Sequence, residues 1–308
     1  RVQRGRELLA KHRALLNQIQ QETGIPAQYL VAFWGLETNY GGYFGDWSVP
    51  DSLATLACDP RRSTFFTQEL LNAMRILDAG DISPERMIGS WAGAMGHMQF
   101  MPSTFIRYAK DVDGDGRRDL WGSIPDAMGS AANFLRQLGW IAGLSWGQEV
   151  RLPSSFDYSL AGRDQMLSHV EWANLGVTTA SGAILAPTEQ KAALLVPAGH
   201  QGPAFLVTKN FYIIMRWNRS EFYALSVGHL ADRIAGAAAL QRTPQVDTVK
   251  ITREQVRQLQ EDLSTLGIDA GEADGVLGSV TRQAISRFQQ KTQRIADGHL
   301  DAALLLAI

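Results

Sequence analysis

The stretch AFWGLETNYGG, Ala32–Gly42, places one acidic residue, Glu37, inside a largely apolar and aromatic run. Pro26 suits the first turn of a helix, and the pair Gly41-Gly42 suits its end. We therefore predict a helix between these residues that carries a carboxyl group among apolar side chains.

The face of that helix decides how Glu37 behaves. Leu30, Phe33 and Trp34 lie seven, four and three residues before Glu37, so they share its face. A carboxyl group buried without a partner raises its pKa and holds a proton near neutral pH, as a general acid requires. The same spacing fits a helix-end glutamate that caps backbone amides or pairs with an arginine such as Arg107, and periodicity alone does not separate the two.

A second stretch, GSWAGAMGHMQFMPSTF at Gly89–Phe105, combines small, polar and aromatic residues. Gly93 and Gly96 allow the backbone to approach another surface or a ligand closely. Ser90 and Gln99 add hydrogen-bonding groups beside aromatic side chains, a mixture typical of a pocket for a sugar-sized ligand. Helices that pack against each other through small residues would have the same composition.

Composition excludes several classes of function. With 308 residues, of which 45% are hydrophobic and 19% charged, the chain can bury a core and hold more than one domain. A net charge of -2 without a long Lys and Arg run argues against a nucleic-acid partner. A single cysteine, Cys58, and scattered histidines exclude an intrachain disulfide and give zinc no support. No apolar stretch approaches the length of a membrane span, and a start at Arg1 without a signal sequence is typical of a mature form.

The residue pattern that predicts secondary structure changes twice along the chain. Residues 6–140 have helical patterns, whereas the region from about 146 to 216 contains β-prone runs such as EVRLP, AALLVP and AFLVTKNFYIIMRW. Helical patterning returns at 220–240. We therefore predict a mainly α fold of the α+β type, in which a helical domain carries a small strand-containing insertion.

The segment RTPQVDTVK is short, polar and contains proline, so we place a linker at 243–250, between a region 1–242 and a module 251–308. In the module, Thr252 and Gln255 form a capping-box pattern at the start of a helix. The sequences ADGVLGSVTRQAI and ADGHLDAALLLAI repeat each other, each with an Asp-Gly turn that leads into a helix. We expect a small module of three helices.

Four motifs within residues 1–240 together resemble the MltB family of lytic transglycosylases, in the same order and at matching spacing: GLETNYGGYFG, SWAGAMGHMQFMPSTF, DVDGDGRRDLWGSIPDAMGSAANFL and RWNRSEFYALSVGHLADRI. The resemblance implies a lysozyme-like helical catalytic domain that acts on peptidoglycan, with Glu37 as the acid. The family often has tyrosine where Phe134 and Trp217 stand, so stacking on a sugar is kept but a hydroxyl hydrogen bond is not expected. The resemblance also implies contacts with the substrate or transition state at Ser90, Gln99, Met101, Phe134, Trp217, Asn218 and Tyr223.

The mechanism that this resemblance implies uses one carboxylate. Glycosidases usually employ two, but the motifs offer no acidic partner for Glu37. Glu37 would protonate the oxygen of the β-1,4 bond between N-acetylmuramic acid and N-acetylglucosamine, then accept the proton of the muramoyl C6 hydroxyl and leave a 1,6-anhydro product. Two alternatives stay open: a hydrolytic muramidase, and a catalytically silent protein that binds peptidoglycan. GLSWG at Gly143–Gly147 fits a serine-hydrolase motif, but it follows a helical run rather than a strand.

An EF-hand-like loop lies at 111–126, where DVDGDGRRDLWG has acidic residues at positions one, three and five and Gly116 at the sharp turn. Position twelve holds Gly122 in place of a bidentate glutamate, so an acidic residue just beyond it is expected to close the coordination sphere. MltB-like enzymes carry a similar loop, which implies a structural Ca²⁺ ion, and a solvated turn without metal is the alternative. The expected ligands are Asp111, Asp113, Asp115, the carbonyl of Arg117, and Asp126.

The tail at 251–308 resembles the common three-helix peptidoglycan-binding module, most clearly in ADGVLGSVTRQAISRFQ. A tethered module of this kind raises the concentration of the polymer near the catalytic domain. The resemblance places a groove for glycan or peptide at Asp274, Gly275, Thr281 and Arg282, although Asp-Gly is also simply a good turn. We expect peptidoglycan strands and their peptide stems as partners, no organic cofactor, a monomeric chain, and a periplasmic location near the cell wall or outer membrane, as the substrate implies.

Overall fold

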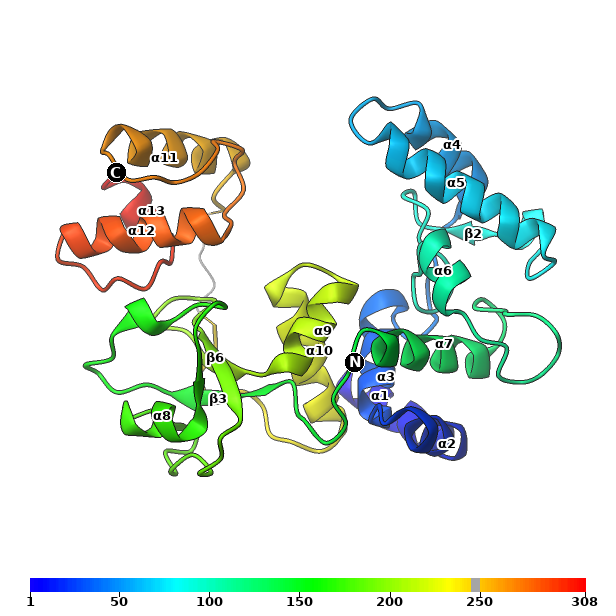
Figure 1. Ribbon diagram of the computed structural model, residues 1–308, viewed down its shortest axis with the longest axis horizontal. Helices are drawn as coiled ribbons and strands as arrows, with labels where there is room; N and C mark the ends of the chain where they lie inside the picture. Colours follow the sequence, from blue (N-terminus) through cyan, green and yellow to red (C-terminus); the bar gives the residue numbers. More distant parts are fainter. Residues whose placement is uncertain (245–249) are drawn as a thin grey trace. The chain divides into compact units, whose positions relative to one another are not determined.

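The computed structural model describes residues 1–244 and 250–308, so the middle of the predicted linker, residues 245–249, lies outside the described residues. The chain divides into two compact units, and each is made of two separate segments. The first unit contains Arg1–Leu144 and Asn210–Ala238, and the second contains Ser145–Lys209 and Ala239–Ile308. The division at 1–242 and 251–308 stays a prediction. The mainly helical fold with a small antiparallel sheet is confirmed (Figure 1).

The first unit is helical apart from a two-stranded ribbon, in which Trp47 is paired with Gly89. None of the helices within the described residues is both long and apolar enough to cross a membrane. The helices are α1 (Val2–Lys11), α2 (Arg13–Thr23), α3 (Ala27–Thr38), α4 (Val49–Ala57), α5 (Ser63–Asp78), α6 (Pro102–Tyr108), α7 (Ile124–Gln137), α9 (Lys209–Trp217) and α10 (Glu221–Ile234), with a short 3₁₀ turn η1 (Pro84–Arg86), and the strands are β1 (Trp47–Ser48) and β2 (Ile88–Gly89).

Helix α3 is the central element of the first unit, because it packs against α1, α2, α7 and α10 (Figure 1). All residues from Tyr29 to Gly35 are buried, so the helix is covered on every side rather than along one stripe. It ends at Thr38, before the predicted Gly41-Gly42 pair, because Asn39 already adopts a left-handed conformation with φ 51°. Glu37 therefore lies in the last turn of a buried helix.

The second unit contains a five-stranded antiparallel sheet in the order β4-β6-β7-β3-β5. Helix α8 (His169–Asn174) covers it with Trp172, whose indole N–H donates to the Ala192 carbonyl at 2.9 Å. A short 3₁₀ turn, η2 (Tyr158–Leu160), precedes β4. The strands are β3 (Gly147–Arg151), β4 (Met166–Ser168), β5 (Thr178–Thr179), β6 (Lys191–Leu195) and β7 (Ala204–Val207).

The predicted extent of the β-prone insertion, to about residue 216, was wrong at its end. The last strand stops at Val207, and the run NFYIIMRW lies in helix α9. Phe211, Ile214 and Met215 are buried at a helical spacing, so packing outweighs the β-propensity of the isoleucines and aromatic residues.

The C-terminal part of the second unit contains helices α11 (Arg253–Thr265), α12 (Ser279–Lys291) and α13 (Ala302–Leu305). The capping box of Thr252 and Gln255 is confirmed, with hydrogen bonds in both directions. Leu259, Leu263 and other apolar residues of these helices form a core of their own.

The internal sequence repeat is also a structural repeat. In the first copy, the Gln260 side chain donates to Asp274 at 3.1 Å and accepts from the Gly275 amide at 2.8 Å. In the second copy, the Gln289 side chain donates to Asp297 at 2.9 Å and accepts from the Gly298 amide at 2.8 Å. A buried glutamine thus fixes each Asp-Gly turn through both ends of its amide.

Candidate active site

Two donors meet the Glu37 carboxyl group at the end of α3. The Tyr223 hydroxyl on α10 donates a hydrogen bond to Glu37 Oε1, and the Trp217 side chain at the end of α9 donates a second. Glu37 forms no ion pair in the part of the chain that the structure describes, and Arg107 instead lies over the Tyr108 ring. The arginine-paired alternative is therefore not what the structure contains.

The surroundings of Glu37 change its acidity. Burial raises the pKa of Glu37 to about 7, and the hydrogen bonds from Tyr223 and Trp217 oppose this rise only in part. Burial and the neighbouring Glu37 raise the pKa of Tyr223, so this phenol remains a donor. Near neutral pH the carboxyl group can therefore both give and accept a proton.

Aromatic rings account for the low polarity around Glu37. Trp217 is at their centre: its ring centroid lies 4.3 Å from that of Phe33, 5.1 Å from that of Phe134 and 5.4 Å from that of Phe100. The resemblance to the MltB family predicted that Trp217 would lack a hydrogen bond that a tyrosine hydroxyl could make. The indole N–H supplies a donor to Glu37 in its place, which the residue type alone did not reveal.

Most of the Gly89–Phe105 stretch, residues 90–101, is a loop between β2 and α6, and not a pair of helices packed on small residues. Gly96 has φ 65°, and a side chain there would come within 2.5 Å of the Leu120 carbonyl oxygen. The Ser90 hydroxyl accepts from the Ala94 amide at 3.0 Å, and the Gln99 amide donates to the carbonyls of Phe44 and Gly96, both at 3.1 Å. Both side chains thus hold the loop in shape.

Several of the expected contact residues have hydrogen-bond partners other than Glu37, or are positioned by packing. Asn218 is exposed and accepts from the Ser220 amide at 3.1 Å, while Met101 is half-buried at the start of α6. Phe134 reaches the site through its contact with Trp217. A role in substrate binding stays a prediction for Ser90, Gln99, Met101, Phe134 and Asn218.

His97 is a part of this region that the sequence analysis missed. The Trp34 indole N–H donates to His97 Nδ1 at 2.9 Å, and the Thr38 hydroxyl donates to the His97 carbonyl at 3.0 Å. Burial lowers the pKa of His97 to about 4, so the ring is neutral and can accept this bond. His97 joins the end of α3 to the loop, and no spacing rule relates residues that are so far apart in sequence.

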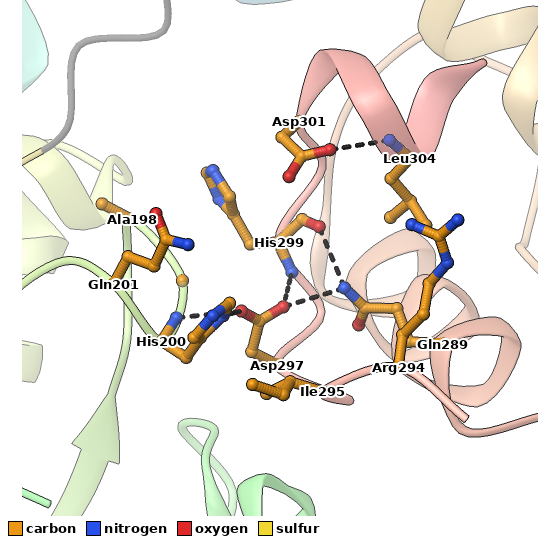
Figure 2. Close-up of a pocket in the computed structure, with 11 residues that line it drawn as sticks. Ala198, His200, Gln201, Gln289, Arg294, Ile295, Asp297, His299, Asp301 and Leu304 are labelled. Atoms are coloured by element: carbon orange, nitrogen blue, oxygen red, sulfur yellow. Dashed lines mark hydrogen bonds and ion pairs between the residues drawn. The ribbon is translucent and has the colours of Figure 1, made fainter. Parts of the chain in front are cut away.

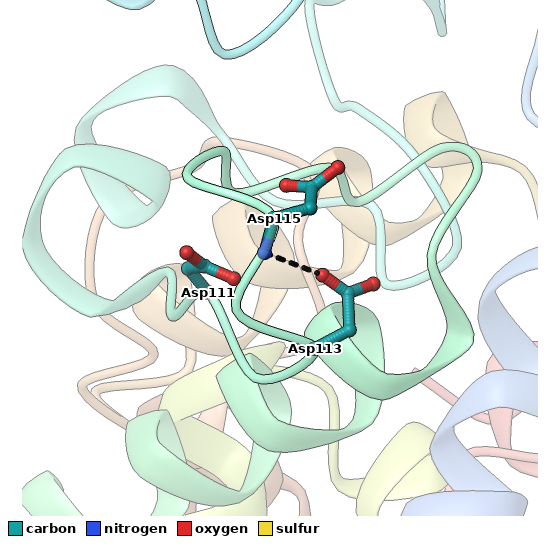
Figure 3. A group of neighbouring side chains, drawn as sticks. All are labelled: Asp111, Asp113 and Asp115. Carbon is teal, nitrogen blue, oxygen red and sulfur yellow. Dashed lines mark hydrogen bonds between the residues drawn. The ribbon is translucent and has the colours of Figure 1, made fainter.

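Three aspartates come together in the loop between α6 and α7 (Figure 3). Asp111, Asp113 and Asp115 are exposed, and each offers a carboxylate oxygen within 4.8 Å of the other two. Asp111 also accepts from the amides of Gly114 and Gly116, at 2.7 and 2.9 Å, which curls the loop around the group. An exposed set of oxygen donors fits the preference of Ca²⁺.

Asp126 was predicted to complete this group, but its carboxylate is used elsewhere. It is fully buried and accepts from the backbone amides of Val112 and Asp119 at 2.7 and 2.8 Å. Burial raises the pKa of Asp126. Its side chain fastens the two ends of the loop, and the side chain of Arg117 pairs with Asp115 at 2.8 Å.

Three of the four predicted groove residues of the C-terminal module, Asp274, Gly275 and Thr281, lie in one hydrogen-bond network around Gln260. The Gln260 side chain donates to Thr281 as well as to Asp274, and Thr281 is 2% exposed. Gly275 has φ 72° and passes close to the Arg253 carbonyl. Their structural role is clear, and the binding role of Asp274, Gly275, Thr281 and Arg282 stays a prediction. GLSWG leads into strand β3 at Gly147 and so lacks the strand-turn-helix geometry of a nucleophilic serine.

Comparisons with known proteins identify the families that the two parts of the chain match. Residues 1–232 match the family described as a transglycosylase SLT domain, and residues 252–308 match a peptidoglycan binding domain. Over 242 residues the chain is 34% identical to the membrane-bound lytic murein transglycosylase B of Escherichia coli K12, covering 76% of this chain but only 64% of that relative. The chain thus spans less than two thirds of that relative's length.

Solved structures extend the likeness. SltB3 from Pseudomonas aeruginosa, in complex with NAG-anhNAM-pentapeptide, is 45% identical, with a TM-score of 0.96 over 99% of this chain and 82% of that one. The Escherichia coli lytic transglycosylase Slt35, in complex with calcium, is 33% identical, with a TM-score of 0.67 over 76% of this chain and 74% of that one. With the family match over most of its length, the chain belongs to the transglycosylase SLT domain family.

Proposed function

We propose that the protein is a lytic transglycosylase that cleaves the β-1,4 bond between N-acetylmuramic acid and N-acetylglucosamine in peptidoglycan. The observation that carries this proposal is the single carboxyl group of Glu37, held by two donors among aromatic rings with a pKa of about 7. The activities of the relatives, one of them solved with a peptide-bearing muropeptide, support the same substrate.

Glu37 acts first as an acid and then as a base. In its protonated form it gives a proton to the bridging oxygen, and the bond from that oxygen to C1 of the muramoyl residue breaks. The resulting carboxylate takes the proton of the muramoyl C6 hydroxyl while the C6 oxygen bonds to C1. The product is a 1,6-anhydro sugar, and no water is consumed.

Glu37 is ionised after the first step and before the second. Tyr223 and Trp217 assist both steps by donating hydrogen bonds to this carboxylate. Their hydrogen bonds stabilise the ionised form and keep the pKa of Glu37 from rising further. Ser90 or Asn218 orients the acetamido group of the substrate, whose oxygen stabilises the positive charge at C1. Phe134 and Trp217 offer ring faces to a sugar, with Gln99 and Met101 beside them.

A calcium ion belongs to this proposal as a structural element. The ion would be held by Asp111, Asp113, Asp115 and the carbonyl of Arg117. Two observations support this: the three carboxylates lie close together, and Slt35 was solved in complex with calcium. The ion would offset most of the negative charge of the three aspartates and so stabilise the loop that precedes α7.

The remaining parts serve to bring the enzyme to its polymer. Residues 1–242 would form the catalytic region, and residues 251–308 would bind peptidoglycan and raise its local concentration. Such a substrate places the enzyme in the periplasm.

Mass spectrometry of the products from purified peptidoglycan tests the proposal. The native protein is expected to release anhydromuramoyl products, and Glu37→Gln is expected to release none. Products heavier by one water would identify a hydrolytic muramidase. A protein that sediments with the wall but releases nothing would be a binding protein only.

A further inference from the structure

A cavity of about 320 Å³ lies in the second unit, where the loop at 198–201 meets the second Asp-Gly turn (Figure 2). It contains none of the predicted groove residues of the C-terminal module. Both the loop and the C-terminal module line it, with Ala198, Gly199, His200, Gln201, Gln289, Arg294, Ile295, Asp297, His299, Asp301 and Leu304.

The floor of the cavity is fixed by Asp297, whose side chain is 4% exposed. One oxygen of its carboxylate accepts from the His200 amide at 2.9 Å and contacts His200 Nδ1 at 2.6 Å. The other accepts from the Gln289 side chain at 2.9 Å and the His299 amide at 3.0 Å. Asp274, at the equivalent place in the first repeat, instead accepts from the Gln260 side chain at 3.1 Å and the Val276 amide at 2.8 Å.

Gly199 permits this close docking. It has φ 68°, and a side chain there would come within 2.9 Å of Asp297 Oδ2. The floor is thus a rigid junction of loop and turn in which the Asp297 carboxylate is already satisfied. A ligand must therefore be recognised by the rim.

The rim carries polar groups that other residues do not use. The Arg294 guanidinium and the Gln201 amide make no hydrogen bond or ion pair to any residue that the structure describes. Asp301 uses one carboxylate oxygen to accept from the Leu304 amide at 2.7 Å and leaves the other available. Two side chains add apolar surface to the lining: Leu304, near Arg294 and Asp301, and Ile295, on the side of Asp297 (Figure 2).

We propose that this cavity binds the peptide stem of peptidoglycan, with Arg294 holding a carboxylate and Asp301 an ammonium group of one diamino acid residue. This rests on the proposed function, which supplies the polymer. Neutral sugars do not call for a cation and an anion on one rim, whereas a diamino acid carries both charges on one side chain. The volume is at the lower end for small-molecule sites, which suits a short peptide and not a glycan strand.

Isothermal titration of the chain 1–308 with a synthetic, sugar-free stem tetrapeptide that contains diaminopimelic acid tests this site. Arg294→Ala and Asp301→Asn are each expected to weaken binding by about tenfold, the loss of one charge-assisted hydrogen bond. Asparagine keeps an oxygen for the Leu304 amide, so α13 remains capped. Arg287→Ala is the matched control, because this exposed arginine of α12 does not line the cavity.

Absence of binding at millimolar peptide, or equal affinity of the native chain and both rim variants, would overturn the site. The products of the same proteins on peptidoglycan distinguish this failure from that of the proposed function. Anhydromuramoyl products without peptide binding reject the cavity alone. Peptide binding that depends on Arg294 and Asp301, without such products, rejects the transglycosylase alone.

Discussion

Two sets of carboxyl groups in the first unit have opposite surroundings. Glu37 is alone among aromatic rings and meets two side-chain donors, Tyr223 and Trp217. The aspartates at 111, 113 and 115 are exposed, lie together and accept from backbone amides. The first environment holds a proton near neutral pH, and the second concentrates negative charge where a cation can reach it. One functional group thus acquires two chemistries through its access to water and the donors it meets.

Removal of one carboxyl group from each set should give the sharpest contrast. Glu37→Gln is expected to lower kcat on peptidoglycan by on the order of 10³-fold, because the proposed acid and base is lost. Asp113→Asn should keep most of the activity below its unfolding temperature. Release rates of anhydromuramoyl products measure both, and a similar loss in the two variants would erase the functional distinction between the sets.

Calcium bound by the three exposed aspartates should stabilise the protein against unfolding. At a free Ca²⁺ concentration a hundred times its Kd, the free energy of unfolding is expected to rise by about 2.7 kcal/mol. Thermal unfolding in EDTA and in added Ca²⁺ measures this change, and Asp115→Asn should reduce it. A midpoint that chelation leaves unchanged in the native chain would show that the aspartates form only a solvated turn.

The pH dependence of stability should single out Glu37. Its folded pKa of about 7 lies above the ordinary value of 4.5, so its stabilising contribution is complete below pH 4.5 and is lost as the pH rises through 7. Glu37→Gln should therefore gain about 2 kcal/mol in unfolding free energy relative to the native chain between pH 5 and pH 8. Urea unfolding at the two pH values measures this gain.

The exposed Glu22 provides the control for that experiment. Glu22→Gln on α2 removes a carboxyl group that water already solvates, so its effect should be nearly the same at both pH values. If both variants gained the same unfolding free energy between pH 5 and pH 8, burial would not be the cause of the raised pKa of Glu37.

The donors around Glu37 should have the smallest effect. Activity that needs the protonated acid falls as the pH rises through about 7. Tyr223→Phe removes a hydrogen bond to the ionised form, so this fall should move to higher pH by about one pH unit. The pH profile of kcat measures the shift, and Trp217→Phe, which keeps the ring but loses the N–H, should move it in the same direction. A shift to lower pH would contradict the assigned donors.

Local patterns predicted much of the fold, because they depend on neighbours in sequence. The helix that carries Glu37, the capping box at Thr252 and the repeat of Asp-Gly turns all follow from spacings of a few residues. The helix at 209–217 was mistaken for β-prone sequence, because its packing partners, and not its residue types, decide its conformation.

The site was predicted in part, and the missing part is long-range. Family motifs indicated Glu37, Trp217 and Tyr223, and the structure brings these three side chains together. The donor role of the Trp217 indole and the contact of His97 with Trp34 depend on side-chain directions that spacing does not determine. The burial of Asp126 by backbone amides is of the same kind.

The two-segment build of the first unit has a consequence for the order in which its parts meet during synthesis. Its chain leaves the unit at Leu144 and returns at Asn210, and the hydrogen bond from Tyr223 to Glu37 joins residues 186 positions apart. A nascent chain that has exposed α3 still lacks both donors and much of the aromatic packing around its carboxyl group. The surroundings of the Glu37 carboxyl group are thus completed late in synthesis, and a chain that ends before α10 lacks the Tyr223 donor.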